Sequence, residues 1–307
     1  MEKHKNKENQ WRDWVGKHTD KHDAHLQNLT ALRENLSSLN NLLDTAINSE
    51  FHGIKSHLKR VECLALLTAI DELNDCMLDN IEKRRFSAAE AIARITLEHT
   101  VNFLYVIEDS TTERALSLLK QHIFGARERA KKWHSYLKGA NREDGVEVAK
   151  IRLHHLNECE EMIPELAKAK PWPDARRRFQ ALDLEHFYHD LFTPASDSVH
   201  TLAEDIFNLF MVTHAAPEHQ DLAYRSMRAD KVSFSVYLCS SVLLFYAEAI
   251  CRLSVAMKNS EMEEKAIELG KTIGAITVAM NNDTLSDLFS AAGDTSLRTH
   301  MPNERSS

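Results

Sequence analysis

Helix-breaking residues are scarce in this chain, and their scarcity restricts the fold more than any other feature of the sequence. Only 8 glycines and 6 prolines occur among 307 residues. Because glycine and proline interrupt helices most strongly, long helices joined by short turns are expected. A hydrophobic content of 43% is enough for a sizeable core. We therefore predict an all-α protein, a multi-helix antiparallel bundle.

Apolar periodicity and stop signals divide the chain into three parts. Residues 1–50 are expected to be an N-terminal extension, loosely docked up to about residue 20 and helical from residue 22. Residues 51–280 are the main helical-bundle domain, and the polar residues 281–307 are predicted to be a disordered tail. The expected helices cover residues 22–48, 57–83, 87–109, 110–138, 146–169, 232–257 and 261–280, with another helix from residue 183 interrupted at Pro194.

Two capping boxes, Ser87–Glu90 and Ser110–Glu113, predict the starts of neighbouring helices. Because only a tight turn separates residues 87–109 from residues 110–138, these two helices are expected to form an antiparallel hairpin.

The first helix carries leucines at alternating spacings of three and four, which is a heptad seam. Its members are Leu29, Leu32, Leu36, Leu39 and Leu43. About three repeats are near the minimum for a coiled coil, so packing within the chain is favoured over a homodimer.

Charge, cysteines and the N-terminus favour a cytoplasmic protein. The net charge of −8 disfavours nucleic acid unless basic residues cluster. Five cysteines without a C-x-x-C pair indicate reduced thiols, and no apolar run resembles a signal peptide. The apolar residues 232–257 carry four serines before an ion pair between Glu248 and Arg252, so we interpret them as a central buried helix and not as a membrane span.

The segment ARITLEHTVNFLY, residues 93–105, carries a narrow polar stripe. At 100° per residue, Arg94, Glu98, Asn102 and Tyr105 fall within about 80° of each other, and most other positions are apolar. The stripe indicates a helix buried on most sides that faces a strip of solvent or an internal polar cleft. A buried arginine needs a carboxylate, so we predict that Arg94 contacts Glu98 or Glu90.

A second polar set follows about ninety residues later. Ser196, His200 and Glu204 share one helical face, and Tyr188 precedes them. These residue types occur in hydrolase triads, but a serine on a plain helix lacks the amides that stabilise an oxyanion. A polar network or the wall of a ligand cleft is the favoured interpretation. We expect His200 to approach Arg94, leaving a gap for a small anion, a phosphate or a water.

The segments AEAIARITLEHTVNFLY and FYHDLFTPASDSVHTLAEDI resemble a bacterial all-helical family of unknown function. The resemblance covers about residues 60–255. It implies a site in which an Arg and a Glu one turn apart go with a later Tyr, Ser and His. The matching residues are Arg94, Glu98, Tyr188, Ser196 and His200.

The spelling R-x-x-x-x-H, from Arg94 to His99, is also similar to the HEPN ribonucleases, which are helical bundles that dimerise over RNA. This resemblance implies that His99 is a general base and that Arg94 stabilises the phosphate, without a metal. The sequence departs from that pattern at Ile95, where those enzymes usually carry a polar residue, and Glu98 would compete for the arginine. By helical geometry His99 lies about 140° from Arg94 among apolar residues, which favours a core histidine with a backbone partner.

Other candidate sites are weaker. Basic residues interleaved with aromatics at 127–142 and 168–179 could bind RNA, although a solvated helix face is favoured. His154 and His155 lie one turn before Glu158 and Cys159, but the two pairs occupy different faces, so no metal site is predicted. There is no phosphate-binding loop or dinucleotide fingerprint, and no cofactor is expected. The favoured function is therefore binding or regulation through a polar cleft that takes a small anion or phosphate-containing ligand, and the alternative is a HEPN-like endoribonuclease of the toxin or phage-defence type.

Overall fold

The computed structural model describes the backbone of residues 2–200 and 203–293, and side chains for residues 12–196, 203 and 205–283. Within these ranges the regular structure is helical, without a strand. The predicted all-α class is confirmed. The predicted tail, residues 281–307, falls largely outside the description, and helix α12 (Ser260–Gly293) continues through its first part.

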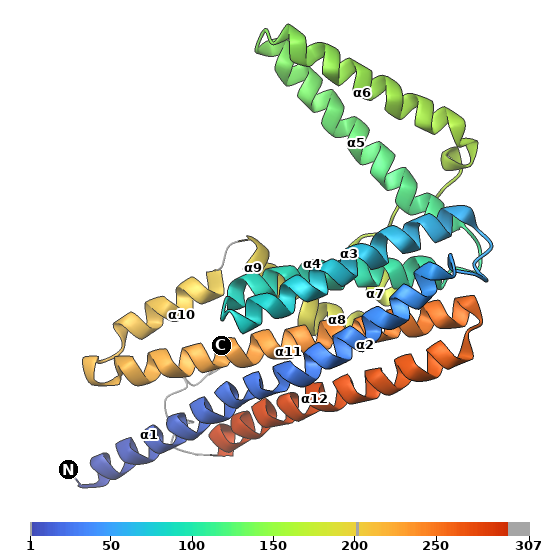
Figure 1. Cartoon of the computed structure of the whole chain (residues 1–307). Helices are drawn as coiled ribbons and strands as arrows, with labels where there is room; N and C mark the ends of the chain where they lie inside the picture. The colour runs from blue at the N-terminus through green and yellow to red at the C-terminus, as the bar shows by residue number, and fades with distance from the viewer. Residues whose placement is uncertain (1, 201–202, 294–307) are drawn as a thin grey trace, which may run out of the picture.

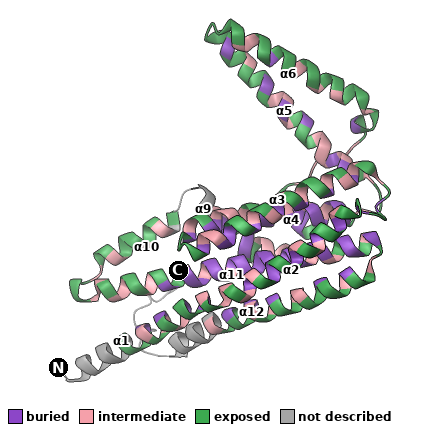
Figure 2. Cartoon of the chain, viewed as in Figure 1, coloured by how far each residue is buried: buried purple, intermediate pink, exposed green. Residues whose placement is uncertain are grey.

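One long helix, α11 (Pro217–Met257), lies at the centre of the bundle. It packs against α2 (Leu29–Asn48), α3 (His57–Glu82), α4 (Phe86–Ile107) and α12, while α3 and α4 pack against each other (Figure 1). Figure 2 shows that buried residues concentrate where these helices meet. The bundle was therefore predicted correctly, but α11 starts fifteen residues before the apolar residues 232–257 from which this helix was predicted.

By length and composition alone α11 could cross a membrane. In the structure, 72% of its most apolar window is buried against other helices. This burial matches the central core helix that the sequence predicted.

The N-terminal extension is helical from its beginning. Helix α1 (Glu2–Asp23) lies against α11 and leads through the 3₁₀ helix η1 (Ala24–Asn28) into α2. The sequence predicted a loosely docked start up to about residue 20, but within the described side chains of that segment Val15 and Thr19 are buried, although α1 has few apolar residues. In α2 the leucine seam is core as predicted, with four leucines at most 2% exposed: Leu32, Leu36, Leu39 and Leu43.

Helices α5 (Glu113–Gly139) and α6 (Glu143–Met162) form a hairpin that projects from the bundle (Figure 1). Most of its surface is exposed (Figure 2). The prediction that α4 and α5 pair is wrong, since α5 packs mainly against α6. Ile123, Leu137 and Ala149 are nevertheless buried.

Both predicted capping boxes are absent. Helix α4 begins after Arg85 without a side-chain cap, and Ser87 donates instead to Asp205. At the start of α5, the Asp109 carboxylate accepts the backbone amide of Arg114. Ser87 is thus held by a residue distant in the sequence, and Asp109 takes the capping role that was predicted for Ser110.

Short helical segments follow the hairpin in the sequence. They are η2 (Pro164–Ala167), α7 (Ala175–Ala181), α8 (Glu185–Phe187), the π-helix η3 (Tyr188–Phe192) and α9 (Thr193–His200). The predicted interruption at Pro194 takes the form of η3, because a π-turn just before the proline accommodates its ring and missing amide. Helix α10 (Ala203–His214) then pairs with the start of α11.

Candidate functional site

Helix α4 carries the central residue of the candidate site, Arg94. More than half of the helix's residues are buried, as predicted. The polar stripe faces the short segments η3 and α9, which pack against α4. The stripe therefore meets protein along much of its length.

Arg94 makes three contacts that fix its guanidinium. Nη1 donates to Oε2 of Glu98 at 2.9 Å, and Nε donates to Oγ of Ser196 at 3.0 Å. Its Cζ lies 3.2 Å from the centroid of the Phe192 ring, a cation–π contact. The predicted pair with Glu98 is confirmed, and the contact with Ser196 joins the two polar sets found in the sequence.

A second arginine, Arg178 of α7, approaches the same carboxylate. Its Nη2 donates to Oε1 of Glu98 at 3.1 Å, and its Nη1 donates to the Pro173 carbonyl at 2.6 Å. Burial lowers the pKa of Arg178, with Glu98 and Asp174 opposing that shift. Its Nε is buried and has no hydrogen-bond partner among the described residues. Sequence reasoning missed Arg178 because it assigned the whole run 176–178 to a solvated face.

Aromatic rings flank both guanidinium groups. Arg178 lies over the Trp172 ring at 5.3 Å. Tyr188 stacks on Phe192, with centroids 5.2 Å apart, and therefore supports the ring that carries Arg94. Tyr188 belongs to the site as a packing residue.

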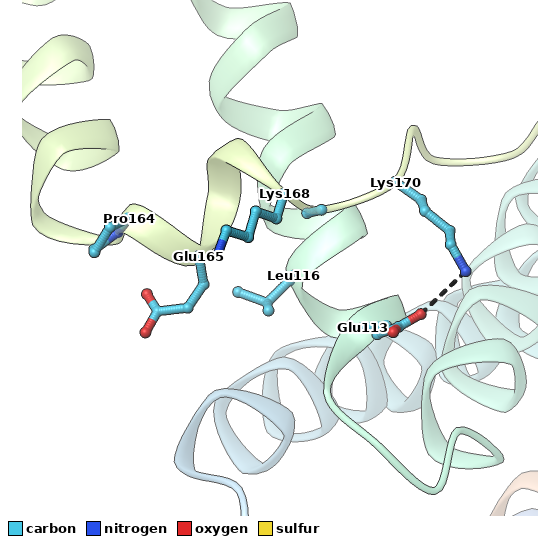
Figure 3. A pocket seen from close by; sticks show the side chains of 7 residues that line it. Glu113, Leu116, Pro164, Glu165, Lys168 and Lys170 are labelled. Atoms are coloured by element: carbon cyan, nitrogen blue, oxygen red, sulfur yellow. Dashed lines mark hydrogen bonds and ion pairs between the residues drawn. The ribbon is translucent and has the colours of Figure 1, made fainter.

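The site is a packed polar cluster with one exposed edge. The side chains of Arg94 and Arg178 are 13% and 5% exposed, whereas that of Glu98 is 39% exposed. A hollow of about 450 Å³ lies elsewhere, between the start of α5 and η2, and an ion pair between Lys170 and Glu113 borders it (Figure 3). Neither Arg94 nor Arg178 lines that hollow.

Two predicted site residues, His200 and Glu204, have side chains outside the described residues. The backbone places His200 one turn after Ser196 at the end of α9. The expected approach of His200 to Arg94 therefore stays a prediction.

His99, the candidate base, lies on α4 and is partly buried. Burial lowers the pKa of its imidazole, and the nearby charge of Glu98 only partly opposes this. Its Nδ1 is buried and has no partner within the described part of the chain. The favoured interpretation of a core histidine with a backbone partner is thus not borne out at this nitrogen.

Glu90, the other predicted partner of Arg94, belongs to a separate network. Only 1% exposed, it accepts from Lys231 Nζ at 2.6 Å and from Ser235 Oγ at 2.5 Å. Lys231 also contacts Asp205 at 2.8 Å. Burial alone would lower the pKa of Lys231, but these carboxylates outweigh it and raise the pKa.

Of the weaker candidates, the basic segment 168–179 contributes Arg178 and Trp172 to this site, whereas the other two lie on the hairpin. His154 and Glu158 approach within 3.2 Å on the exposed face of α6. Trp133 and Tyr136 of the first basic segment are exposed on α5.

The pattern of a family described as a family of unknown function (DUF5677) matches residues 62–218, about half of the chain. The chain belongs to this family. The matched region runs from α3 to the start of α11 and contains Arg94, Glu98, Arg178 and Ser196. The predicted family resemblance is confirmed, and the resemblance to HEPN ribonucleases is not shown. No curated protein and no solved structure matched the chain.

Proposed function

We propose that the cluster around Arg94 and Arg178 binds a small anion, a carboxylate or a phosphate group, and that this protein acts by binding or regulation. One observation carries the proposal: two largely buried arginines share a single, partly exposed carboxylate, that of Glu98. Among the described residues only one carboxylate is hydrogen-bonded to the two guanidinium groups, and the charge of Asp174 acts on Arg178, so a second anion would find an unpaired positive charge at Arg94 once Glu98 turns outward. Arginine suits that role because its planar fork matches two-oxygen groups.

The exposure of the three side chains indicates how an anion would enter. Glu98 is the member in contact with solvent, so its carboxylate can rotate outward while both guanidinium groups stay in place. Phe192 and Trp172 hold the planes of these groups before binding, which lowers the entropic cost of association. The buried Nε–H of Arg178 is a further donor for an incoming oxygen.

The test measures Tm at increasing concentrations of inorganic phosphate and, separately, of a nucleoside monophosphate. At ten times the Kd, binding stabilises a protein by about 1.4 kcal/mol, which for a chain of this length raises Tm by roughly 2 °C. Glu98→Gln removes the competing charge, so the addition of either anion should raise the Tm of this variant more than that of the wild type. Arg94→Gln should abolish the response.

Glu185→Gln is the matched control, because Glu185 is also 39% exposed and bound by an arginine, Arg176, on the outer surface. It should respond like the wild type. An absence of stabilisation in both wild type and Glu98→Gln, or an equal gain in Glu185→Gln, would refute the anion site.

One observation favours the alternative, a HEPN-like endoribonuclease. The lowered pKa of His99 keeps its imidazole neutral near pH 7, as a general base requires. Incubating total RNA with wild type and with His99→Ala decides between the two functions. Degradation by the wild type alone supports the nuclease, and intact RNA in both samples excludes it.

A further inference from the structure

Three potential metal ligands from distant parts of the sequence meet where α1 lies on α11. Nε2 of His18 is 2.7 Å from Oδ1 of Asp230, and Nδ1 of His22 is 3.1 Å from the same oxygen. The three ligand atoms all lie within 4.8 Å of one another. We propose that His18, His22 and Asp230 form a binding site for a divalent transition metal such as Zn²⁺.

The spacing of these atoms fits a metal ion. Zinc binds imidazole nitrogen at about 2.0–2.1 Å and carboxylate oxygen at about 2.0–2.2 Å, so tetrahedral ligands lie roughly 3.3 Å apart. The observed separations of 2.7 and 3.1 Å need only a few tenths of an ångström of movement. Histidines four residues apart share one face of α1, and this spacing places both rings toward one ion.

The ligand types determine which metal fits. Two imidazoles with one carboxylate suit zinc and its neighbours in the first transition row, whereas Mg²⁺ and Ca²⁺ prefer all-oxygen sites. The side chain of His22 is 4% exposed and that of Asp230 is 53% exposed. Solvent therefore reaches the site from the carboxylate side, where a water can complete the coordination.

The surroundings hold the two imidazoles in place. Trp14 stacks on His18, with centroids 5.2 Å apart and planes inclined by 13°. His25 continues the row one turn later, but its Nδ1 is bound to Ser233 and its Nε2 contacts Asp283. Protein partners thus occupy both nitrogens of His25, so it is a neighbouring histidine outside the proposed ligand set.

A metal in this site would join two helices whose ligands lie 212 residues apart. Binding would thus stabilise the packing of α1 on α11, because these ligands come together only in the folded chain. The H-x-x-x-H spacing at residues 18–22 was the signal in the sequence, but its third ligand could not be inferred without the fold.

The experiment uses the full chain after treatment with a chelator. Titration with Zn²⁺ in a calorimeter should give one ion per chain, and bound Co²⁺ should show the visible absorption of a four-coordinate site. The double variant His18→Ala/His22→Ala should bind at least about 100-fold more weakly, since loss of supporting groups alone costs 10–100-fold.

The control is His154→Ala/His155→Ala, which removes two histidines from the exposed helix α6 and should bind Zn²⁺ like the wild type. Asp230→Asn replaces the double alanine variant if that variant fails to fold. The amide has the shape of the carboxylate and can still accept a hydrogen bond, but it lacks the negative charge of the ligand. Retained stoichiometry and affinity in Asp230→Asn, equal loss in the control, or no binding by the wild type would each overturn the site.

Discussion

Glu98 and Glu185 illustrate how the burial of a partner decides what a carboxylate contributes. Both side chains are 39% exposed, and each is bound by arginine. The partners of Glu98 are 13% and 5% exposed, whereas Arg176, which binds Glu185, is 54% exposed. Water can replace Glu185 at Arg176, but it cannot readily reach Arg178.

Glu98→Ala is therefore expected to destabilise the fold by about 3 kcal/mol, because it leaves buried positive charge without its carboxylate. Glu185→Ala should cost less than about 1 kcal/mol, as for other exposed pairs. Thermal unfolding of both variants at one pH measures the difference. Equal melting temperatures would show that the Arg94 cluster is no more than a surface ion pair.

Glu62 on α3 should make stability depend on pH. Its Oε2 is buried without a partner among the described residues, and burial raises the pKa to about 8. Between pH 4.5, the ordinary value, and pH 8 the folded state binds more protons than the unfolded state. Stability contributed by the neutral carboxyl is thus present at low pH and is lost as the pH rises through this window.

Glu62→Gln should therefore raise Tm at pH 8 and change it little at pH 5. We expect a gain on the order of 1–3 kcal/mol at pH 8, less than the full shift implies because the residue is partly solvated. Melting curves of both proteins across this range measure it, with Glu72→Gln as the exposed control on the same helix. A gain independent of pH would contradict the assignment.

Among the helices, those with strong apolar periodicity were predictable and those defined by tertiary contacts were not. Helix α3 begins at His57 as expected, since Ser56 caps it locally. The start of α4 was predicted to within one residue, but the predicted cap is absent because Ser87 bonds to Asp205, a partner 118 residues away. No local pattern contains such a contact.

The candidate site shows the same division. Arg94 and Glu98 lie one turn apart, so helical geometry alone paired them. Ser196 was predicted as part of a polar set, but its bond to Arg94 crosses 102 residues. Arg178 was missed because a run of three arginines looks alike in sequence, while only the fold buries one of them to 4% exposure.

The whole molecule consists of a bundle and a projecting hairpin that packs chiefly against itself. The two segments that connect the hairpin to the bundle lie close together at the base of the hairpin. Lys120 donates to the Ala169 carbonyl at 2.6 Å, and Lys170 pairs with Glu113 at 3.2 Å. The bundle can therefore close without the hairpin.

Replacing residues 123–166 by a flexible linker of about six residues, which spans roughly 13 Å, should leave the bundle folded. We expect Tm to change by less than about 2 °C, equivalent to roughly 1 kcal/mol. Circular dichroism during heating and size-exclusion chromatography measure the outcome. Loss of cooperative unfolding would show that the hairpin is part of the bundle's core.

The position of α11 in the sequence also matters for synthesis of the chain. This helix fills the centre of the bundle, yet it begins only at residue 217. On the ribosome, α2, α3 and α4 emerge before the helix that covers their apolar faces, and at 5–20 residues per second that interval lasts several seconds or more. The early helices can pair locally, as α3 and α4 do, but the leucines of α2 must wait for α11 and α12. Until α11 and α12 have been made, only local pairing such as that of α3 with α4 can cover the apolar faces of the early helices.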